Sequence, residues 1–454
     1  MKDTKYYYSR LIEEKINRTL KSSGAILITG PKFCGKSTTC KRFAKSIIEL
    51  NDDNLIEIVN ADNSVALNGE LPRMIDEWQT VPNLWNKVKS RVDSLGVFGQ
   101  YILTGSATPA DNSKIHHSGS GRITPIIMRP MSLFESKDSI GKYSIKEMFD
   151  EKDIFVFDSN ENHSLIDTAF YICRGGWPLS IQKDRRIALD VTRNYYEGLF
   201  NFKNSENKKY RNKNPEIVKM LLKSYARNIS SEASYQTIMK DVMQSNSRNM
   251  NIKTFDTYLD ILHELFLVDD LLAWCPNIRS KSNIRTTPTR HFVDPSLACL
   301  SLNISPEDLL IDANTFGLFF EDLAVRDLKI YSESIDGEIR HYRDSSGLEC
   351  DAVIHLRDGR WAPIEIKLGS QEAIELAAKN LIKLINNIDE KYSKPSFAMI
   401  LTATGKAYRR NDGIYVIPIN LLRNWLVNSF SKYISASDEK ILNQFNHLFW
   451  NNLY

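Results

Sequence analysis

A phosphate-binding loop is the first feature of this 454-residue chain that could do chemistry. Residues 30–37 read Gly-Pro-Lys-Phe-Cys-Gly-Lys-Ser, the spacing G-x-x-x-x-G-K-S, between a β-prone run at 26–29 and a helical pattern beginning near Ser37. The glycines let the backbone point N–H groups at phosphate oxygens, and the helix N-terminus adds a positive dipole end. We expect Lys36 to reach the β- and γ-phosphates of ATP and Ser37 to bind Mg²⁺. The predicted nucleotide-binding residues are Gly30, Pro31, Lys32, Phe33, Cys34, Gly35, Lys36, Ser37, Thr38 and Thr104.

Two carboxylates follow a short apolar run downstream of the loop. Met74 and Ile75 lead directly into Asp76 and Glu77. In P-loop nucleotide hydrolases one acid at this place helps to hold Mg²⁺, and in many ATPases the next acid polarises the attacking water. We therefore assign Asp76 to the metal and Glu77 to the water. The alternative is a strand that ends in two solvated acids.

Polar and basic residues then follow two further β-prone runs. The run Gln100–Ala107 ends in Thr104-Gly105-Ser106, where a hydroxyl could contact the γ-phosphate or serve ordinary turn chemistry. Arg122 follows a glycine-rich turn and Arg129 ends the next run. An arginine near the γ-phosphate would stabilise charge in the transition state. We rank Arg122 ahead of Arg129, and a surface position is the alternative for either.

A second group of chemically capable residues lies near the C-terminal end of the chain. Glu365 and Lys367 are separated by one residue on a β-prone run, so alternation places them on one face. Asp351, on the preceding run, can approach Glu365 across a hairpin to make a two-carboxylate site for Mg²⁺ or Mn²⁺. Lys367 could orient or help to deprotonate a water that attacks a phosphodiester. Glu321, on an apolar helix, is the third acid that we expect in this cluster.

Strands and helices must position both groups. Tyr8–Lys21 has helical spacing, and Leu55–Asp62 is predicted to be the second strand of an α/β core. The charged stretch Lys137–Asp150 is typical of a solvated boundary. From Phe316 onward the pattern gives a helix, three strands, the helix Gln371–Ile388 and a further strand, an αβββαβ order.

The middle of the chain has a different pattern. From Pro215 three short helices precede two β-prone segments, as in a winged helix-turn-helix, with Ile252–Leu265 as the candidate recognition helix and Lys253, Thr254 and Tyr258 near its front. A basic wing that could touch DNA phosphates carries Arg279, Lys281, Arg285 and Arg290. The alternative is a spacer that makes protein contacts.

Composition bounds the class of protein. The chain is 42% hydrophobic and 25% charged with a net charge of +3, which is ordinary globular usage and too small a charge to imply a nucleic-acid partner alone. Six cysteines without metal-ligand spacing favour reduced thiols and a cytoplasmic protein, and we expect Cys34 and Cys40 to be packing residues. No apolar run has the roughly 18 residues needed to cross a bilayer, so we expect no membrane partner.

Five strings give the chain a family resemblance: GPKFCGKSTT, PRMIDEWQTVPNLW, ILTGSATP, HHSGSGRI and MRPMSLFES. In that order they resemble a family of prokaryotic AAA-type ATPases whose C-terminal domain is similar to PD-(D/E)xK nucleases. The resemblance implies an AAA-type P-loop core, in which Thr104 would sense the γ-phosphate, and a restriction-endonuclease-like domain. Glu321 matches the auxiliary acid of that nuclease core, and Cys350 stands before Asp351 where many relatives have proline or an apolar residue.

We accordingly expect four domains: an ATPase core at 1–136, a helical lid or linker at 137–213, a winged helix at 214–300 and a nuclease-like domain at 301–454. Two functions fit. In one, ATP hydrolysis is coupled to DNA binding and to metal-dependent phosphodiester cleavage. In the other, the protein is an ATP-dependent switch whose terminal domains bind a protein partner, and either form could be a homo-oligomer. The expected catalytic residues are Glu77, Asp76, Arg122, Glu321, Asp351, Glu365 and Lys367, and the expected metal ligands are Ser37, Asp76, Asp351 and Glu365.

Overall fold

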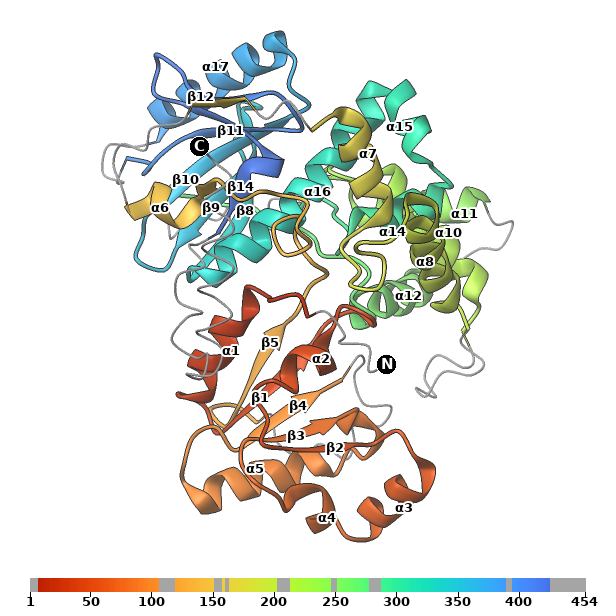
Figure 1. The fold of residues 1–454 in the computed structure, drawn as a ribbon. Coiled ribbons are helices and arrows are strands. Elements are labelled where there is room, and N and C mark those ends of the chain that lie inside the picture. Colours follow the sequence, from red (N-terminus) through yellow and green to blue (C-terminus); the bar gives the residue numbers. More distant parts are fainter. Residues whose placement is uncertain are drawn as a thin grey trace.

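The computed structural model describes residues 7–105, 119–150, 157–159, 163–201, 213–245, 251–276, 287–388 and 394–424. Figure 1 shows an N-terminal α/β lobe below a larger body, in which a C-terminal sheet lies beside a group of helices. The long helix α16 (Ala313–Ser334) runs between that sheet and that group of helices.

The N-terminal lobe is built on a five-stranded parallel sheet in the order β2-β3-β4-β1-β5. Its strands are β1 (Ala25–Thr29), β2 (Ser46–Glu49), β3 (Arg73–Asp76), β4 (Tyr101–Thr104) and β5 (Ile123–Ile127). Its helices are α1 (Ile12–Leu20), α2 (Lys36–Cys40), α3 (Asp53–Ala61), α4 (Ser64–Leu67), the 3₁₀ turn η1 (Trp78–Thr80) and α5 (Leu84–Leu95). Separate apolar clusters form on the α1 and α2 side and on the α3 to α5 side, so both faces of the sheet are covered, as parallel sheets require.

The predicted second strand is wrong, because Leu55–Asp62 lies in helix α3 and the second strand is Ser46–Glu49. The Asp52 carboxylate caps the helix by accepting a hydrogen bond of 3.0 Å from the Leu55 N–H. The β-branched residues that suggested a strand fit a helix equally well. Val59 is fully buried on one face while Ile58 is 53% exposed.

The central part of the chain is helical, with α7 (Leu165–Arg174), α8 (Arg185–Gly198), α10 (Pro215–Arg227), α11 (Tyr235–Ser245), α12 (Ile252–Glu264), α14 (Pro295–Leu302) and α15 (Pro306–Ile311). After α12 the chain makes antiparallel bridges from Val268 to Phe292 and from Leu271 to Thr289. The expected order of three helices and a β pair is present. The expected wing residues Arg279, Lys281 and Arg285 lie outside the described residues. Arg290 is buried and paired with Asp270, so it is not the phosphate contact that we expected.

The C-terminal sheet has seven strands in the order β7-β12-β13-β11-β10-β9-β8. They are β7 (Phe157–Ser159), β8 (Gly337–Arg343), β9 (Glu349–Leu356), β10 (Trp361–Lys367), β11 (Met399–Thr402), β12 (Lys406–Arg409) and β13 (Tyr415–Pro418), and α17 (Gln371–Asn387) connects β10 to β11. From α16 to β11 the order is αβββαβ, as predicted. The strands β8, β9 and β10 are antiparallel neighbours, whereas β10 and β11 are parallel.

The segment Lys137–Asp150 is packed and not a solvated boundary. Strand β6 (Tyr143–Ser144) pairs with β14 (Leu422–Arg423), and α6 (Ile145–Asp150) buries Met148 and Phe149. Just beyond it, β7 pairs with β12 of the C-terminal sheet. Its charges misled the prediction because they lie beside apolar side chains that face inward. This part of the chain is therefore structurally part of the C-terminal domain.

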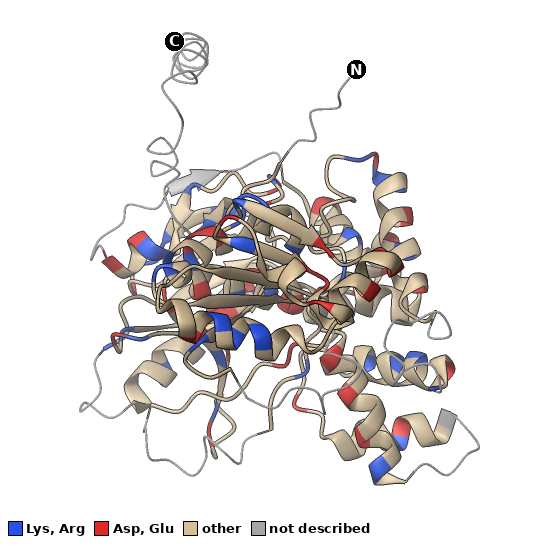
Figure 2. Ribbon diagram, turned by 90° about the horizontal axis from the view of Figure 1, so that it is seen from below, with Lys and Arg blue, Asp and Glu red and all other residues tan. Residues whose placement is uncertain are grey.

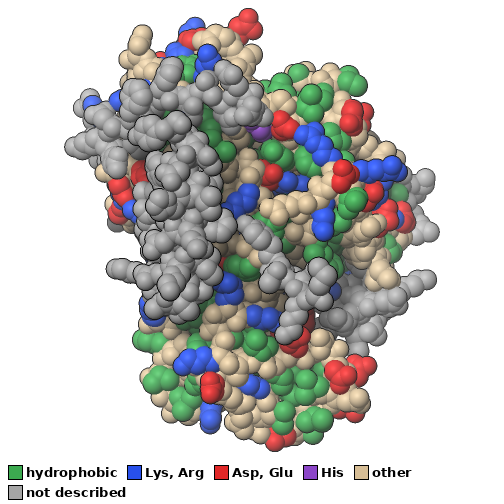
Figure 3. All heavy atoms as spheres, viewed as in Figure 1, with side chains coloured by type: hydrophobic (Ala, Val, Ile, Leu, Met, Phe, Trp, Pro, Cys, Tyr) green, Lys and Arg blue, Asp and Glu red, His purple; other side chains and the backbone are tan. Residues whose placement is uncertain are grey.

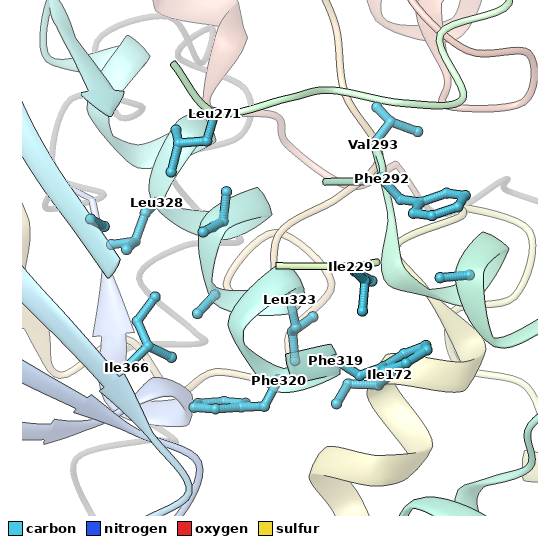
Figure 4. Packing of buried hydrophobic residues seen from close by; sticks show 14 of the residues in the cluster. Ile172, Ile229, Leu271, Phe292, Val293, Phe319, Phe320, Leu323, Leu328 and Ile366 are labelled. Atoms are coloured by element: carbon cyan, nitrogen blue, oxygen red, sulfur yellow. The ribbon is translucent and has the colours of Figure 1, made fainter. Parts of the chain in front are cut away.

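Helix α16 is the shared core element of the larger body. Figure 4 shows Phe320 on the side of the helix near Ile366 of β10, and Phe319 beside Ile172 of α7. All four side chains are buried in one apolar cluster. Because it is apolar on two faces, the helix packs against the sheet and the helical group at once. Of the helices that the structure describes, none is long and apolar enough to cross a lipid bilayer.

Candidate nucleotide site and a second carboxylate centre

The phosphate loop follows the carboxyl end of β1 and leads into α2. Gly30 has φ of 142° and Gly35 has φ of 98°, both in the region that favours glycine. A Cβ atom on Gly30 would also lie 2.1 Å from the Met128 carbonyl oxygen, so no side chain fits there. Phe33 also has a positive φ of 64°, and its exposed ring packs edge-on against Tyr195 at 5.5 Å between centroids.

Lys36 is buried inside the loop. Its ammonium donates hydrogen bonds to the carbonyl oxygens of Gly30 at 2.9 Å and Pro31 at 2.8 Å. These carbonyls hold the positive charge at the loop mouth, where the helix N-terminus also favours anions. The expected loop residues Lys32 and Thr38 are exposed, whereas Cys34 is buried.

Two side-chain hydroxyls and one backbone N–H donate to the same carboxylate oxygen. Asp76 Oδ1 accepts hydrogen bonds from the Ser37 hydroxyl at 3.1 Å, from the Thr104 hydroxyl and from the Glu77 N–H at 3.2 Å. The parallel register pairs Asp76 on β3 with Thr104 on β4, so both lie at the carboxyl edge of the sheet. A hydroxyl beside a carboxylate is an oxygen ligand pair that suits Mg²⁺. Ser106, the other hydroxyl at this strand tip, lies outside the described residues.

Glu77 is held in an uncommon backbone conformation. It has φ of 53°, in the left-handed region, immediately after β3. Its carbonyl accepts hydrogen bonds from the Thr80 N–H at 3.0 Å and the Thr80 hydroxyl at 2.8 Å. Its carboxylate accepts a hydrogen bond from the side-chain amide of Gln79, a residue that we did not single out from the sequence.

The second centre brings together the predicted residues of β9 and β10. The Lys367 ammonium lies 2.8 Å from Asp351 Oδ2 and 2.8 Å from Glu365 Oε2. Asp351 Oδ2 also accepts a hydrogen bond of 2.6 Å from the Ile366 N–H. Burial and the nearby charge of Asp351 raise the pKa of Glu365 to about 8.

Glu321 of α16 lies within electrostatic range of the same centre. Burial, and then the negative charge of Asp351, raise the pKa of Glu321 well above its usual range. In the described part of the chain, however, no group of three or more His, Cys, Asp or Glu side chains is arranged to hold a metal ion. The expected three-carboxylate metal cluster is therefore not formed. Lys367 bridges two of the carboxylates instead.

Three family models match successive parts of the chain. Residues 22–137 match one described as AAA domain, and residues 166–308 and 316–422 match two domains of unknown function, DUF8612 and DUF4143. Residues 22–137 form an AAA-type ATPase domain.

Two curated relatives, whose function is not described, match part of the chain. Uncharacterized proteins of Mycobacterium tuberculosis and Mycobacterium bovis are each 30% identical to the chain over 113 residues, which cover 24% of this chain and 26% of theirs. The chain thus matches about a quarter of the length of these relatives.

Two solved structures are weakly similar. A signal transduction ATPase with a tetratricopeptide repeat sensor from Pyrococcus horikoshii is 14% identical with a TM-score of 0.23, over 73% of this chain and 50% of that one. C. elegans PCH-2 is 16% identical with a TM-score of 0.17, over 56% and 64%. Both TM-scores are too low to establish a common fold.

Neither predicted arginine faces the nucleotide loop of its own AAA domain. The Arg122 carbonyl accepts a hydrogen bond from the Ala25 N–H at the amino end of β1, whereas the phosphate loop follows the carboxyl end. The guanidinium pairs with Asp93 at 2.8 Å. Arg122 and the phosphate loop of one chain therefore lie at opposite ends of β1, so Arg122 would reach a γ-phosphate only in a neighbouring copy of the chain.

Arg129 lies at the correct end of the AAA sheet but points out of the domain. Its guanidinium pairs with Asp269 and with Glu333 of α16, both at 2.6 Å. Burial alone would raise the pKa of Asp269, but the charges of Arg129 and Lys329 hold it well below its usual range. Arg129 is therefore a connector between the AAA domain and the larger body.

Arg10, a residue that we did not single out from the sequence, supports the phosphate loop of the AAA domain. Its guanidinium donates to the Cys34 carbonyl at 2.7 Å and to the Arg129 carbonyl at 2.8 Å, and pairs with Glu135 at 3.1 Å. Both charged side chains are buried. No local motif identifies Arg10, because its partners are distant in sequence.

Proposed function

We propose that this protein is a Mg²⁺-dependent ATPase that works at the loop of its AAA domain. The observation that carries the proposal is the meeting of the Ser37 and Thr104 hydroxyls on Asp76 beside the Lys36 loop. Bound Mg²⁺ would neutralise charge on the β- and γ-phosphates, and Ser37 and Asp76 are the residues that would hold it.

Each further residue has a defined task in this reaction. The loop N–H groups and Lys36 bind phosphate oxygens, Thr104 contacts the γ-phosphate, and Glu77 accepts a proton from the attacking water. The Thr80 hydrogen bonds fix the backbone of Glu77, so its carboxylate remains at the carboxyl edge of the sheet.

Two substitutions test this proposal. Lys36→Ala should abolish binding of a fluorescent ATP analogue, whereas Glu77→Gln should bind it normally and lose turnover by about 10²–10⁴-fold, the usual contribution of general base catalysis. Lys41→Ala, at an exposed lysine just after α2, is the matched control and should change neither property. If wild-type and Glu77→Gln proteins hydrolyse ATP equally fast, Glu77 is not the base.

We propose phosphodiester cleavage as a second function, at the Asp351, Glu365 and Lys367 centre. What supports it is that a lysine and two carboxylates meet within 2.8 Å contacts, with Glu321 in electrostatic reach. Asp351 and Glu365 are the residues that would hold Mg²⁺ or Mn²⁺, and Lys367 would orient the attacking water. A crystal soaked in Mn²⁺ should show anomalous density about 2.0–2.3 Å from carboxylate oxygens of Asp351 and Glu365. An empty soaked site would remove this function and favour the switch.

DNA is the proposed partner for this second function. On α12, Lys253 is exposed and Thr254 is half-buried, whereas Tyr258 is buried and is not available to a ligand. On the face seen in Figure 3, Lys and Arg side chains are interspersed with acidic and apolar ones. Phosphate contacts from such a surface would be few, so the slope of affinity against salt concentration should be shallow.

The alternative is an ATP-dependent switch whose helical and C-terminal parts bind a protein partner or another copy of the chain. The connector Arg129 favours this reading, because it joins the AAA domain to Asp269 and Glu333 of the larger body. ATP hydrolysis measured with and without single-stranded and duplex DNA separates the two. Stimulation by DNA supports the nucleic-acid function, and no stimulation together with no measurable DNA binding supports the switch.

A further inference from the structure

Gln79 is a buried amide next to the proposed catalytic base. It lies in η1 and is 8% exposed. Its neighbour Trp78 anchors the turn, because the indole is buried and packs on Trp85 at 5.1 Å between ring centroids. From this anchored turn the Gln79 amide nitrogen donates to Glu77 Oε2. If the amide were flipped, its oxygen would lie against the carboxylate oxygen, and both atoms are acceptors. The amide nitrogen must therefore face the carboxylate.

The other end of the same amide lies against the tip of β4. Gln79 Oε1 is buried and has no hydrogen-bond partner among the described residues. It occupies the space where a side chain on Gly105 would begin, since a Cβ there would lie 2.3 Å from this oxygen. The φ of Gly105 is not in the left-handed region, so backbone conformation does not require glycine here. Glycine is required at position 105 because the Gln79 side chain occupies the space that a Cβ atom would need.

The strand tip that Gln79 contacts is part of the nucleotide site. Gly105 follows Thr104, whose hydroxyl donates to Asp76, and the Gly105 N–H donates to the Ile28 carbonyl of β1 at 3.3 Å. Gln79 therefore lies between the end of β3, which carries the base, and the end of β4, which carries the γ-phosphate contact.

We propose that Gln79 is the positioning residue for Glu77 in ATP hydrolysis, and that Gly105 is glycine to leave room for it. This inference rests on the proposed ATPase function. A hydrogen bond donated by Gln79 to one carboxylate oxygen fixes the plane of the Glu77 carboxylate, and a fixed plane orients the base toward the attacking water.

Three variants test it. Gln79→Met keeps the length of the side chain without the donor, Gln79→Glu replaces the donor by a like charge, and Gly105→Ala displaces the amide with a methyl group. Each should lower kcat at least about tenfold, as expected for a misplaced general base, while affinity for a fluorescent ATP analogue changes less than about twofold.

A matched control separates positioning from folding. Gln100 is another fully buried glutamine, at the opposite end of β4, and its amide donates to the Val97 carbonyl at 2.7 Å. Gln100→Met should leave kcat at its wild-type value even where it lowers the melting temperature. An equal fall of kcat in Gln100→Met would assign the Gln79 effect to folding and overturn the inference.

The remaining outcomes distinguish failure of the Gln79 inference from failure of the proposed ATPase function. If the wild-type protein does not hydrolyse ATP, the proposed function fails, and the positioning role fails with it. If the wild type is active and Glu77→Gln is not, yet Gln79→Met and Gly105→Ala keep kcat within about twofold of the wild-type value, the ATPase function stands and the inference is overturned.

Discussion

Arg10 is a buried arginine that stabilises the phosphate loop, although arginine is usually a surface residue. One buried guanidinium joins the phosphate loop at Cys34, the strand exit at Arg129 and the carboxylate of Glu135. Glu135 in turn accepts hydrogen bonds from the Leu11 N–H at 2.8 Å and the Ser132 N–H at 2.8 Å. The loop is therefore braced by a buried ion pair rather than by apolar packing alone.

Removing this guanidinium should be costly. Arg10→Ala leaves the Glu135 carboxylate buried without its countercharge, and breaking one half of a buried ion pair costs about 3–5 kcal/mol. Urea denaturation should show that loss. The exposed pair Arg122–Asp93 is the matched control, since Arg122→Ala should change stability by less than about 1 kcal/mol. Equal effects of the two substitutions would contradict the brace.

His341 gives the protein a pH dependence of stability. It is buried on β8, and burial, together with the nearby His291, lowers its pKa from 6.5 to about 4. The folded state therefore prefers the neutral ring. Its contribution is fully present above pH 6.5 and is lost as pH falls through 6.5 toward 4, by up to about 3 kcal/mol.

The measurement is the free energy of unfolding at about pH 7.5 and about pH 5, for the wild type and for His341→Gln. The difference between the two pH values should be smaller in the variant, because glutamine does not titrate. An unchanged difference would show that other groups carry the acid sensitivity.

The predicted nucleotide-site residues that the structure brings together are those whose chemistry is local. Lys36, Ser37 and the Asp76-Glu77 pair each stand in a short string whose spacing reflects one loop or one strand end. Arg10 and Gln79 were missed for opposite reasons. The partners of Arg10 come from distant segments, whereas Gln79 lies two residues from Glu77 in a turn whose direction no periodicity reveals.

At the scale of elements, α16 joins the parts of the larger body. Apolar side chains on one face of the helix meet the C-terminal sheet, and those on another face meet α7 (Figure 4). Phe320→Ala should cost about 3–5 kcal/mol in unfolding free energy, as for other buried phenylalanines. Leu318→Ala on the same helix, where the leucine is 40% exposed, should cost less than about 1 kcal/mol. Similar costs for both would contradict the packing described.

The type of an element, helix or strand, was predictable where the length of the apolar run and the turn residues on either side of it indicated the same type. The hairpin β9–β10 turns at Asp358-Gly359, and alternation placed Glu365 and Lys367 on one face, so the predicted αβββαβ order was found. The run Leu55–Asp62 failed because its apolar residues fit both periods, and only the cap by Asp52 decides between them. The segment Lys137–Asp150 failed because its partner strand β14 lies at the other end of the chain.

At the scale of the whole molecule, positive and negative side chains are not segregated. Figure 2 shows Lys and Arg mixed with Asp and Glu along the described helices and strands. Contacts between the parts are specific instead, as at Arg129, which pairs with Asp269 and Glu333.

The structure predicts which fragments of the chain fold independently. A fragment of residues 301–454 lacks β6 and β7, which pair with β14 and β12, and lacks α7, which covers α16. That fragment should aggregate or melt without cooperativity, because it exposes strand edges and a large apolar face. A fragment of residues 131–454 retains all three elements and should unfold cooperatively. Calorimetry on both checks this, and a cooperative transition in the shorter fragment would contradict it.

The pairing of β7 with β12 also orders events during synthesis. The ribosome makes β6 and β7 directly after the AAA domain, and the strands that pair with them are the last described part of the chain to be made. The early strands must therefore wait unpaired while the helical group is translated. The same pairing predicts that residues 143–159 and the C-terminal sheet evolve as one unit. A recombination event that exchanges the C-terminal sheet without residues 143–159 separates strands that fit one another, so the two segments should be inherited together.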